Sequence, residues 1–342
     1  MRRAFITGTS GFIGFHLARL MLDQGWQVHG LDGMTSYYDI ALKRARLALL
    51  QQNPGFTQTE AMLENAEAVM QAAQNARPDV IVHLAAQAGV RYSLEAPRAY
   101  IDSNLTGTFN VMEAARELKV GHLLMASTSS VYGANEEMPF RETDKADHPL
   151  TIYAATKKAN EAMGHAYAHL HDLPVTMFRF FTVYGPWGRP DMAPFKFTKA
   201  ILAGEPIDIY NNGEMWRDFT YVTDLVQGIL ALIDAVPIRP ANRAEIADGE
   251  IADGDSLSPA APFRVVNIGN GQKVRLMDFI EAIETATGRT AIRNFLPMQQ
   301  GDVPATWADA SLLNRLTGGC PATDVRDGMR AFVEWYRGFY RV

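Results

Sequence analysis

The stretch Ala4-Phe5-Ile6-Thr7-Gly8-Thr9-Ser10-Gly11-Phe12-Ile13-Gly14 decides the fold. Its apolar start is too short for a helix and ends at a glycine, which is typical of a buried strand. Apolar residues then recur at helical spacing from Phe12 to Leu20. The pattern predicts a strand, a tight turn and a helix.

The turn carries three glycines, Gly8, Gly11 and Gly14, directly before the predicted helix. Glycine lets the backbone turn sharply and lets a pyrophosphate approach the amides, while the N-terminus of the helix favours an anion. A glycine triplet alone is a weak signal, because a tight strand-to-helix turn explains it nearly as well. Asp32 ends the next predicted strand, where a carboxylate can accept both ribose hydroxyls of an adenosine and would repel a 2′-phosphate. The combination favours NAD over NADP, although Asp32 could simply end a strand.

Strand-like and helix-like segments alternate beyond this unit. This alternation predicts an α/β protein with a Rossmann-like doubly wound parallel sheet that helices cover on both faces. The predicted strands are 28–31, 80–84, 122–126 and 175–180, and the predicted helices are 64–77, 100–118 and 153–170.

The length of 342 residues suggests two structural units. Prolines and glycines become frequent from Thr182 to Pro194, where we place the start of the second unit. We expect an NAD-binding Rossmann domain over residues 1–182 and about 218–268, and a smaller C-terminal α/β substrate domain over 183–217 and 269–342. The amphipathic segment Val325 to Tyr340 is expected to close the second unit as a packed helix.

A solvated insertion loop is predicted at about residues 237–262. This segment is rich in proline and glycine and contains a duplication, in which residues 245–249 and 250–254 both read Glu-Ile-Ala-Asp-Gly. The duplication could instead be an acidic docking element.

Composition and charge limit the partners. The chain is 47% hydrophobic and 20% charged, as soluble globular proteins are. Lys and Arg number 32 and Asp and Glu number 38, so the net charge of −6 argues against nucleic acid as a partner. No run of 18 apolar residues predicts a membrane span. The single cysteine, Cys320, and a strand that begins right after Met1-Arg2-Arg3 lead us to expect a cytoplasmic protein.

Tyr153 and Lys157 stand four residues apart on a predicted helix and therefore share one face. A free phenol has a pKa of about 10, so a tyrosine that acts as a base near neutral pH needs a pKa lower by roughly three units. A neighbouring ammonium and the positive nicotinamide ring of NAD would both favour the phenolate. This spacing also occurs by chance in surface helices, so it counts only together with the glycine turn.

Hydroxyl side chains follow the strand 122–126, in the segment Ser127-Thr128-Ser129-Ser130. In open α/β sheets ligands bind beyond the carboxyl ends of the strands, where these hydroxyls would lie. A hydroxyl-rich turn without function is the alternative. His83 is expected to be a hydrogen-bonded structural histidine. His165 and His169 have ligand spacing, but no carboxylate or cysteine completes a site, so we expect no metal.

Taken together, these segments resemble the nucleotide-sugar epimerases of the extended short-chain dehydrogenase/reductase family, and most closely the members that act on UDP-glucuronate. The similarity covers nearly the whole chain. The segments that carry it are 7–14, 32 with 36–39, 83–93, 126–133, 153–157, 180–192, 217–222, 267–270 and 300–303.

The resemblance implies a role for each matching residue. Tyr153 would be the base, Lys157 would hold the nicotinamide ribose and tune the phenol, and Thr128 would supply the family's catalytic hydroxyl. The residues expected to bind the cofactor are Gly8, Gly11, Phe12, Ile13, Gly14, Asp32, Gln87, Asn104, Tyr153 and Lys157. Those expected to bind the substrate are Arg91, Thr128, Tyr153, Thr182, Arg189, Arg217 and Asp302.

The implied reaction is NAD-dependent 4-epimerisation of UDP-glucuronate to UDP-galacturonate through a 4-keto intermediate. Arg189 would face the sugar carboxylate and Arg217 the diphosphate, because an acidic protein must supply local cations for a substrate with about three negative charges. Arg189 could also be a loop arginine that points to water. Ser129 and Ser130 stand where dehydratases and decarboxylases of the superfamily carry acidic side chains, so simple epimerisation is favoured.

Two other functions stay open: a UDP-glucose or other UDP-hexose 4-epimerase, and a non-catalytic NAD-binding protein. The chain also departs from its relatives at two places. Met62 follows the third strand where relatives often carry an acidic residue for the adenine, and Gln299 and Gln300 stand where glucose-type relatives tend to have arginine. By family analogy the protein would form a homodimer through residues 100–118 and 153–170.

Overall fold

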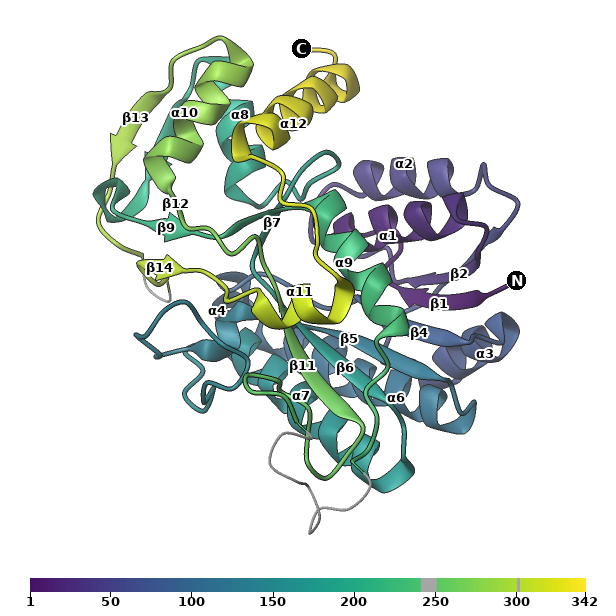
Figure 1. Cartoon of the computed structure of the whole chain (residues 1–342). Helices are drawn as coiled ribbons and strands as arrows, with labels where there is room; N and C mark the ends of the chain where they lie inside the picture. Colours follow the sequence, from purple (N-terminus) through teal and green to yellow (C-terminus); the bar gives the residue numbers. More distant parts are fainter. Residues whose placement is uncertain (241–250, 300–301) are drawn as a thin grey trace.

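A seven-stranded parallel sheet forms the centre of the computed structural model, which describes residues 1–240, 251–299 and 302–342. Its strand order is β11-β6-β5-β4-β1-β2-β3, with a change of direction beside β1. This confirms the doubly wound Rossmann-like prediction (Figure 1). The strands are β1 (Arg3–Thr7), β2 (Gln27–Asp32), β3 (Phe56–Glu60), β4 (Val80–His83), β5 (His122–Thr128), β6 (Val175–Phe180) and β11 (Phe263–Ile268).

Helices cover both faces because side chains alternate along each buried strand. In β1, Ala4 and Ile6 join one hydrophobic cluster, and Phe5 between them joins the other. The first cluster packs under α1 (Phe12–Asp23), α2 (Ile40–Leu50) and α9 (Val222–Asp234). The second packs under α3 (Ala66–Ala76), α6 (Thr108–Glu117) and α7 (Ile152–His171).

Three elements of this half differ from the sequence prediction. β3 was expected only from the family resemblance, as the strand before Met62, and not from the residue pattern, because it is an edge strand with the polar sequence FTQTE and pairs only with β2. α2 was not predicted. The helix expected over 100–118 begins as α5 (Pro97–Tyr100), continues as a π-helix (Ile101–Gly107) and ends as α6.

The rest of the chain builds a smaller α/β unit, as predicted. Figure 1 shows α8 (Ala193–Ala203), α10 (Leu276–Thr287) and α12 (Val325–Tyr340) grouped apart from the large sheet, and all three share one hydrophobic cluster. Short strands connect this unit to the cleft described below. They form the pairs β10 (Phe219–Tyr221) with β7 (Thr182–Tyr184) and β13 (Ile292–Phe295) with β8 (Pro206–Ile209), and the trio β12 (Val274–Arg275), β9 (Trp216–Arg217) and β14 (Ala305–Thr306).

One stretch of the predicted substrate domain returns to the Rossmann core. Leu312 and Leu313 of α11 (Ser311–Thr317) lie in the same buried cluster as α1 and α9. Their apolar side chains pack beside β11 and α9, so this helix contacts the Rossmann core although it follows residue 269. The chain therefore passes between the two halves more often than the change in proline and glycine content suggested.

The insertion loop is only partly described. Most of its duplication lies in residues 241–250, outside the described residues. Residues 255–262 are not solvated as predicted, because Ser258 and Ala261 are buried. Asp255 pairs with Arg264 of β11 at 3.0 Å, and the Ser256 hydroxyl accepts from the Val265 N–H at 3.1 Å. This part of the loop therefore covers the outer edge of the sheet.

Candidate active site

A cleft of about 1370 Å³ lies beyond the carboxyl ends of the parallel strands, between the two halves of the molecule. All but one of the residues that the sequence singled out for cofactor or substrate line this cleft. They are Gly8, Gly11, Phe12, Ile13, Gly14, Asp32, Gln87, Arg91, Thr128, Tyr153, Lys157, Thr182, Arg189, Arg217 and Asp302.

Asn104 is the exception. Its side chain is fully buried and does not line the cleft. Its amide oxygen accepts from the Gln87 N–H at 2.8 Å, and its amide nitrogen donates to the Gln87 carbonyl at 3.0 Å. Asn104 therefore holds the Gln87 backbone from behind instead of lying along the cofactor as predicted.

The glycine turn leaves space and amides for an anion. Gly8 has φ +83°, and a Cβ at Gly14 would lie 2.1 Å from the Gly8 carbonyl oxygen, so neither position accepts a side chain without rearrangement. Among the described residues, no side chain caps α1 and its first turn holds no acidic group. Its first N–H groups are thus available to a phosphate. This geometry fits the diphosphate of a dinucleotide.

Asp32 is fixed at the end of β2. Its carboxylate accepts from the Ser10 N–H at 3.0 Å and from the Met34 N–H at 2.8 Å. A second group near it was missed by the sequence analysis: Lys43 of α2 also lines the cleft and donates to the Thr35 carbonyl at 2.7 Å. No sequence pattern that we used links Lys43 to this edge, because α2 itself was not predicted.

Tyr153, Thr128 and Lys157 meet where β5 ends and α7 begins. The Lys157 ammonium donates to the Ala126 carbonyl at 2.8 Å, and burial lowers the pKa of Lys157 to about 8. Burial raises the pKa of Tyr153, while a hydrogen bond with Thr128 and the positive charge of Arg189 act in the opposite direction. Arg189 is therefore a cation that favours the phenolate, in addition to the Lys157 ammonium and the nicotinamide ring expected from the sequence.

Two arginines approach the cleft from the smaller unit. Arg189 donates from Nε to Asp191 at 3.0 Å, and the Tyr37 hydroxyl donates to the other oxygen of Asp191 at 3.1 Å. Arg217 donates to Asp302 at 3.2 Å, and Arg91 lies 3.4 Å from the second oxygen of Asp302. Asp191 and Tyr37 were not singled out as site residues, although Asp191 stands only two positions after Arg189.

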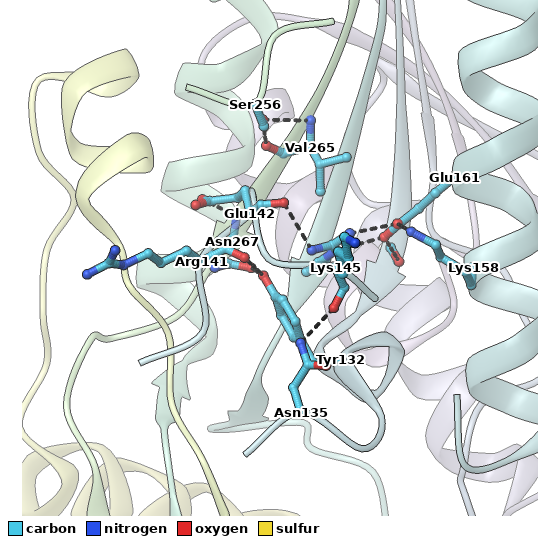
Figure 2. A network of polar contacts seen from close by, with 12 residues as sticks. Tyr132, Asn135, Arg141, Glu142, Lys145, Lys158, Glu161, Ser256, Val265 and Asn267 are labelled. Atoms are coloured by element: carbon cyan, nitrogen blue, oxygen red, sulfur yellow. Dashed lines mark hydrogen bonds and ion pairs between the residues drawn. The ribbon is translucent and has the colours of Figure 1, made fainter. Parts of the chain in front are cut away.

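A buried polar network supports the hydroxyl-bearing end of β5. Figure 2 labels members of this network from the 3-10 helix Ser129–Tyr132 and the loop that follows it, from α7, and from β11 with the segment before it. Glu161, one turn beyond Lys157, binds Arg179 at 2.9 and 2.8 Å and accepts from the Ser127 hydroxyl at 2.7 Å. Glu161 and Arg179 form a buried ion pair, which helps to hold the strand end in place. Only the folded chain brings these residues together.

The histidines have structural partners. His83 is hydrogen-bonded to the hydroxyls of Thr7 and Thr108, at 2.7 and 3.0 Å, and burial lowers its pKa to about 3, which keeps the ring neutral. His165 contacts Ser258 and His169 contacts the Ala260 carbonyl, both at 2.8 Å. Within the described ranges, no three potential metal ligands of the His, Cys, Asp or Glu type gather. None of the helices in those ranges is long and apolar enough to cross a membrane.

Comparison with known proteins identifies the family and the fold. Residues 4–244 match the model of the NAD dependent epimerase/dehydratase family. A probable UDP-glucuronate 4-epimerase of Rhizobium meliloti (strain 1021) is 57% identical over 99% of this chain and 98% of its own length. This level of similarity extends over both halves of the molecule.

Solved structures agree. The UDP-glucuronic acid 4-epimerase of Bacillus cereus, in complex with UDP-glucuronic acid and NAD, superimposes with a TM-score of 0.85 at 30% identity, covering 99% of this chain and 100% of that one. A UDP-glucose 4-epimerase of Thermotoga maritima with UDP-glucose gives a TM-score of 0.83 at 26% identity, covering 98% and 99%. With its glycine turn, its cleft and a family match over most of its length, the chain belongs to the NAD-dependent epimerase/dehydratase family.

Proposed function

We propose that this protein is an NAD-dependent UDP-glucuronate 4-epimerase, which interconverts UDP-glucuronate and UDP-galacturonate through a 4-keto sugar. One observation carries the proposal. The phenol of Tyr153, the glycine turn and the guanidinium of Arg189 all line the same cleft. A base, a dinucleotide site and a cation for an acid group are the three parts that this reaction needs.

The residues that would hold NAD are those of the glycine turn, with Asp32 for the adenosine ribose and Lys157 for the nicotinamide ribose. Bound NAD would accept a hydride from C4 of the sugar and return it to the opposite face of that carbon. Asp32 accepts two backbone N–H bonds in the structure and keeps further lone pairs for the ribose hydroxyls. Gln87, held by Asn104, contributes a fixed edge of the cleft.

Tyr153 would take the proton of the 4-hydroxyl as the hydride leaves, and would return a proton when the carbonyl is reduced. Burial works against this task, since it raises the pKa of the phenol. The Thr128 hydroxyl and the Arg189 charge act against that increase. Lys157 is kept in place by the Ala126 carbonyl, so its ammonium can hold the ribose.

Arg189 would bind the sugar carboxylate, and Arg217 with Arg91 would bind the diphosphate. Asp302 joins the latter two and fixes their guanidinium groups at one end of the cleft. The 4-keto intermediate is a β-keto acid, which loses carbon dioxide when its carboxylate bond aligns with the carbonyl π system. A guanidinium that grips the carboxylate can prevent this alignment. Ser129 and Ser130 line the cleft without supplying an acid or base for elimination.

Product analysis tests the proposal directly. The purified protein is incubated with UDP-glucuronate without added NAD, and UDP-galacturonate is separated from UDP-pentose by chromatography. Formation of UDP-galacturonate as the main product supports the proposal. A UDP-pentose as the main product, or no reaction in the presence of added NAD, contradicts it.

A neutral UDP-hexose is the second candidate substrate. The observation that favours it is the pair between Arg189 and Asp191, which partly neutralises the cation proposed for the carboxylate. The ratio of kcat/KM for UDP-glucuronate to that for UDP-glucose distinguishes the two. We expect this ratio to be far above one, and a ratio below one would identify a hexose epimerase.

We also propose that the protein is a cytoplasmic homodimer. Apolar side chains are exposed along the outer helices: Ile101 of the π-helix, Phe109 of α6 and Ile152 of α7 are 38%, 45% and 42% exposed. An apolar face of this kind is typical of a subunit interface. Light scattering after size-exclusion chromatography is expected to give twice the chain mass of 37.8 kDa. A measured mass equal to that of one chain, at micromolar concentration, would contradict the dimer.

A further inference from the structure

Arg46 of α2 is a buried cation outside the roles assigned so far. Its side chain is fully buried, and among the described residues no carboxylate pairs with it directly, while the charge of Asp32 acts on it from farther away. Within the same part of the chain its Nε has no hydrogen-bond partner. Burying a charge without an opposite charge costs free energy. Such a group is therefore a candidate for function.

The two arms of its guanidinium reach two different binding elements. Nη1 donates to the Ser10 carbonyl in the glycine turn at 2.9 Å, and to the Tyr38 hydroxyl at 2.8 Å. Nη2 donates to the Trp187 carbonyl at 2.6 Å and lies 3.4 Å from the Gly188 carbonyl. Arg46 itself does not line the cleft. It links the wall that would hold the cofactor to the loop that carries Arg189.

Both ends of this link lie next to a ligand-binding side chain. Ser10, whose carbonyl binds Arg46, donates its N–H to Asp32 at 3.0 Å. Gly188 directly precedes Arg189 in the chain. Hydrogen bonds therefore connect Asp32 to Ser10 and Ser10 to Arg46. Arg46 contacts the Gly188 carbonyl, and one peptide bond joins Gly188 to Arg189.

The loop is held in a special conformation by the cofactor half. Trp187 has φ +62°, in the left-handed region that bulky residues rarely adopt. His16 of α1 contacts the Pro186 carbonyl at 2.8 Å, so the carbonyls of residues 186, 187 and 188 all face groups of α1 and α2. A conformation that depends on these contacts shifts when the glycine turn shifts.

We propose that Arg46 is a positioning residue that couples the two halves of the cleft, so that NAD at the glycine turn and the nucleotide sugar at Arg189 strengthen each other's binding. The inference deepens the proposed function and takes the identity of the sugar ligand from it. When the glycine turn is ordered, Ser10 holds the guanidinium of Arg46 in place. That guanidinium in turn holds Trp187, and this contact sets the direction of Arg189. Because the coupling free energy is reciprocal, the sugar ligand strengthens NAD binding by the same factor by which NAD strengthens binding of the sugar ligand.

Equilibrium dialysis of the full-length protein against labelled NAD, with and without saturating nucleotide sugar, measures this coupling. For the unmodified protein we expect UDP-glucuronate to lower the dissociation constant of NAD by roughly 5- to 150-fold, the usual range of such couplings. In Arg46→Met the two dissociation constants are expected to coincide and the KM for UDP-glucuronate to rise. Methionine fills similar space without a buried charge, so the variant is expected to fold.

Arg44→Met is the matched control. Arg44 lies on the same helix but is exposed and pairs with Glu60 at 2.8 Å on the surface, so its removal is expected to leave the coupling intact. Arg46→Lys keeps the charge and provides a second test if Arg46→Met unfolds. A single ammonium cannot reproduce the planar fork that spans Ser10 and Trp187, so the coupling is expected to be lost as well.

The outcomes separate this inference from the proposed function. If UDP-glucuronate is not turned over, the chromatographic assay shows it, and the dialysis is repeated with UDP-glucose. Coupling that is absent in the unmodified protein with its true substrate overturns the role of Arg46. Coupling of undiminished size in folded Arg46→Met or Arg46→Lys overturns it too.

Discussion

The cofactor half and the substrate half of the cleft are built in opposite ways. On the cofactor side, continuous parallel strands deliver Gly8, Asp32 and Thr128 at their carboxyl ends. On the substrate side, two-residue strands pair segments far apart in sequence, as when β9 lies between β12 and β14. Regular secondary structure fixes the first group of residues, whereas tertiary contacts fix the second.

The two sides of the cleft also differ in the partners of their charged side chains. Asp32 is satisfied by backbone N–H groups and has no cation pair within the described residues. Arg189 and Arg217 are each held by a carboxylate, Asp191 and Asp302, before any ligand is considered. The cofactor side therefore offers preformed backbone geometry, and the substrate side offers cations whose charge is balanced until an anion arrives.

The largest effect on catalysis is expected from replacing Tyr153. Tyr153→Phe should lower kcat by at least about 10²- to 10⁴-fold, the usual contribution of a general acid–base group, while NAD content stays unchanged. Steady-state kinetics with UDP-glucuronate and the absorbance of released NAD measure both. A variant with full activity would mean that the phenol is not the base, and a parent protein that binds NAD but shows no turnover at all would be a non-catalytic binder.

Arg189→Met tests the substrate side alone. Loss of a charge-assisted hydrogen bond of about 1.5–3 kcal/mol should lower kcat/KM for UDP-glucuronate by about 10- to 100-fold. UDP-glucose, which lacks the carboxylate, is the internal control and should lose less, because it is affected only through the pKa of Tyr153. A UDP-pentose is expected to appear among the products, because the carboxylate is no longer held. Equal losses for both sugars would assign Arg189 to the fold and not to the carboxylate.

Glu142 tests the edge of the large sheet on the cofactor side. It lies in the network of Figure 2, where its carboxylate accepts from the Asn267 N–H of β11 at 2.8 Å. Burial raises the pKa of Glu142 to about 7. A carboxyl with a raised folded-state pKa stabilises the fold below its unfolded pKa, and this contribution is lost as pH rises toward 7.

The free energy of unfolding should therefore fall by roughly 2 kcal/mol between pH 5 and pH 8 in the unmodified protein relative to Glu142→Gln. Glutamine keeps the acceptor and cannot ionise, so it serves as the neutral reference. Urea unfolding at both pH values provides the measurement. Parallel pH profiles for the two proteins would show that this carboxyl is ionised at an ordinary pKa.

The smallest effect is expected at the adenine end of the cofactor side. Met62 is 40% exposed and lines the cleft, at the position where the family resemblance leads us to expect an acidic residue for the adenine. Met62→Asp should tighten NAD binding by up to about tenfold, the value of one added hydrogen bond. Met62→Asn is the uncharged comparison in the same dialysis assay. Unchanged or weaker NAD binding in both variants would show that the adenine lies elsewhere.

The contrast between the two halves explains which features of the structure the sequence could predict. The glycine turn, Asp32 and the spacing of Tyr153 and Lys157 are local patterns, and each was predicted from its own neighbourhood. The residue pattern did not predict β3, because an edge strand needs few apolar residues. The support that Asn104 gives Gln87 and the link that Arg46 makes to Trp187 were out of reach, because their partners lie 17 and 141 residues away.

Isotope retention at C4 tests the central claim most directly. UDP-glucuronate that carries deuterium at C4 of the sugar is converted in ordinary water, and the product is examined by mass spectrometry and NMR. If C4 is inverted by hydride transfer beside Tyr153, UDP-galacturonate keeps the deuterium at C4. Loss of the label to solvent would contradict the account, because the hydrogen would then have left C4 as a proton.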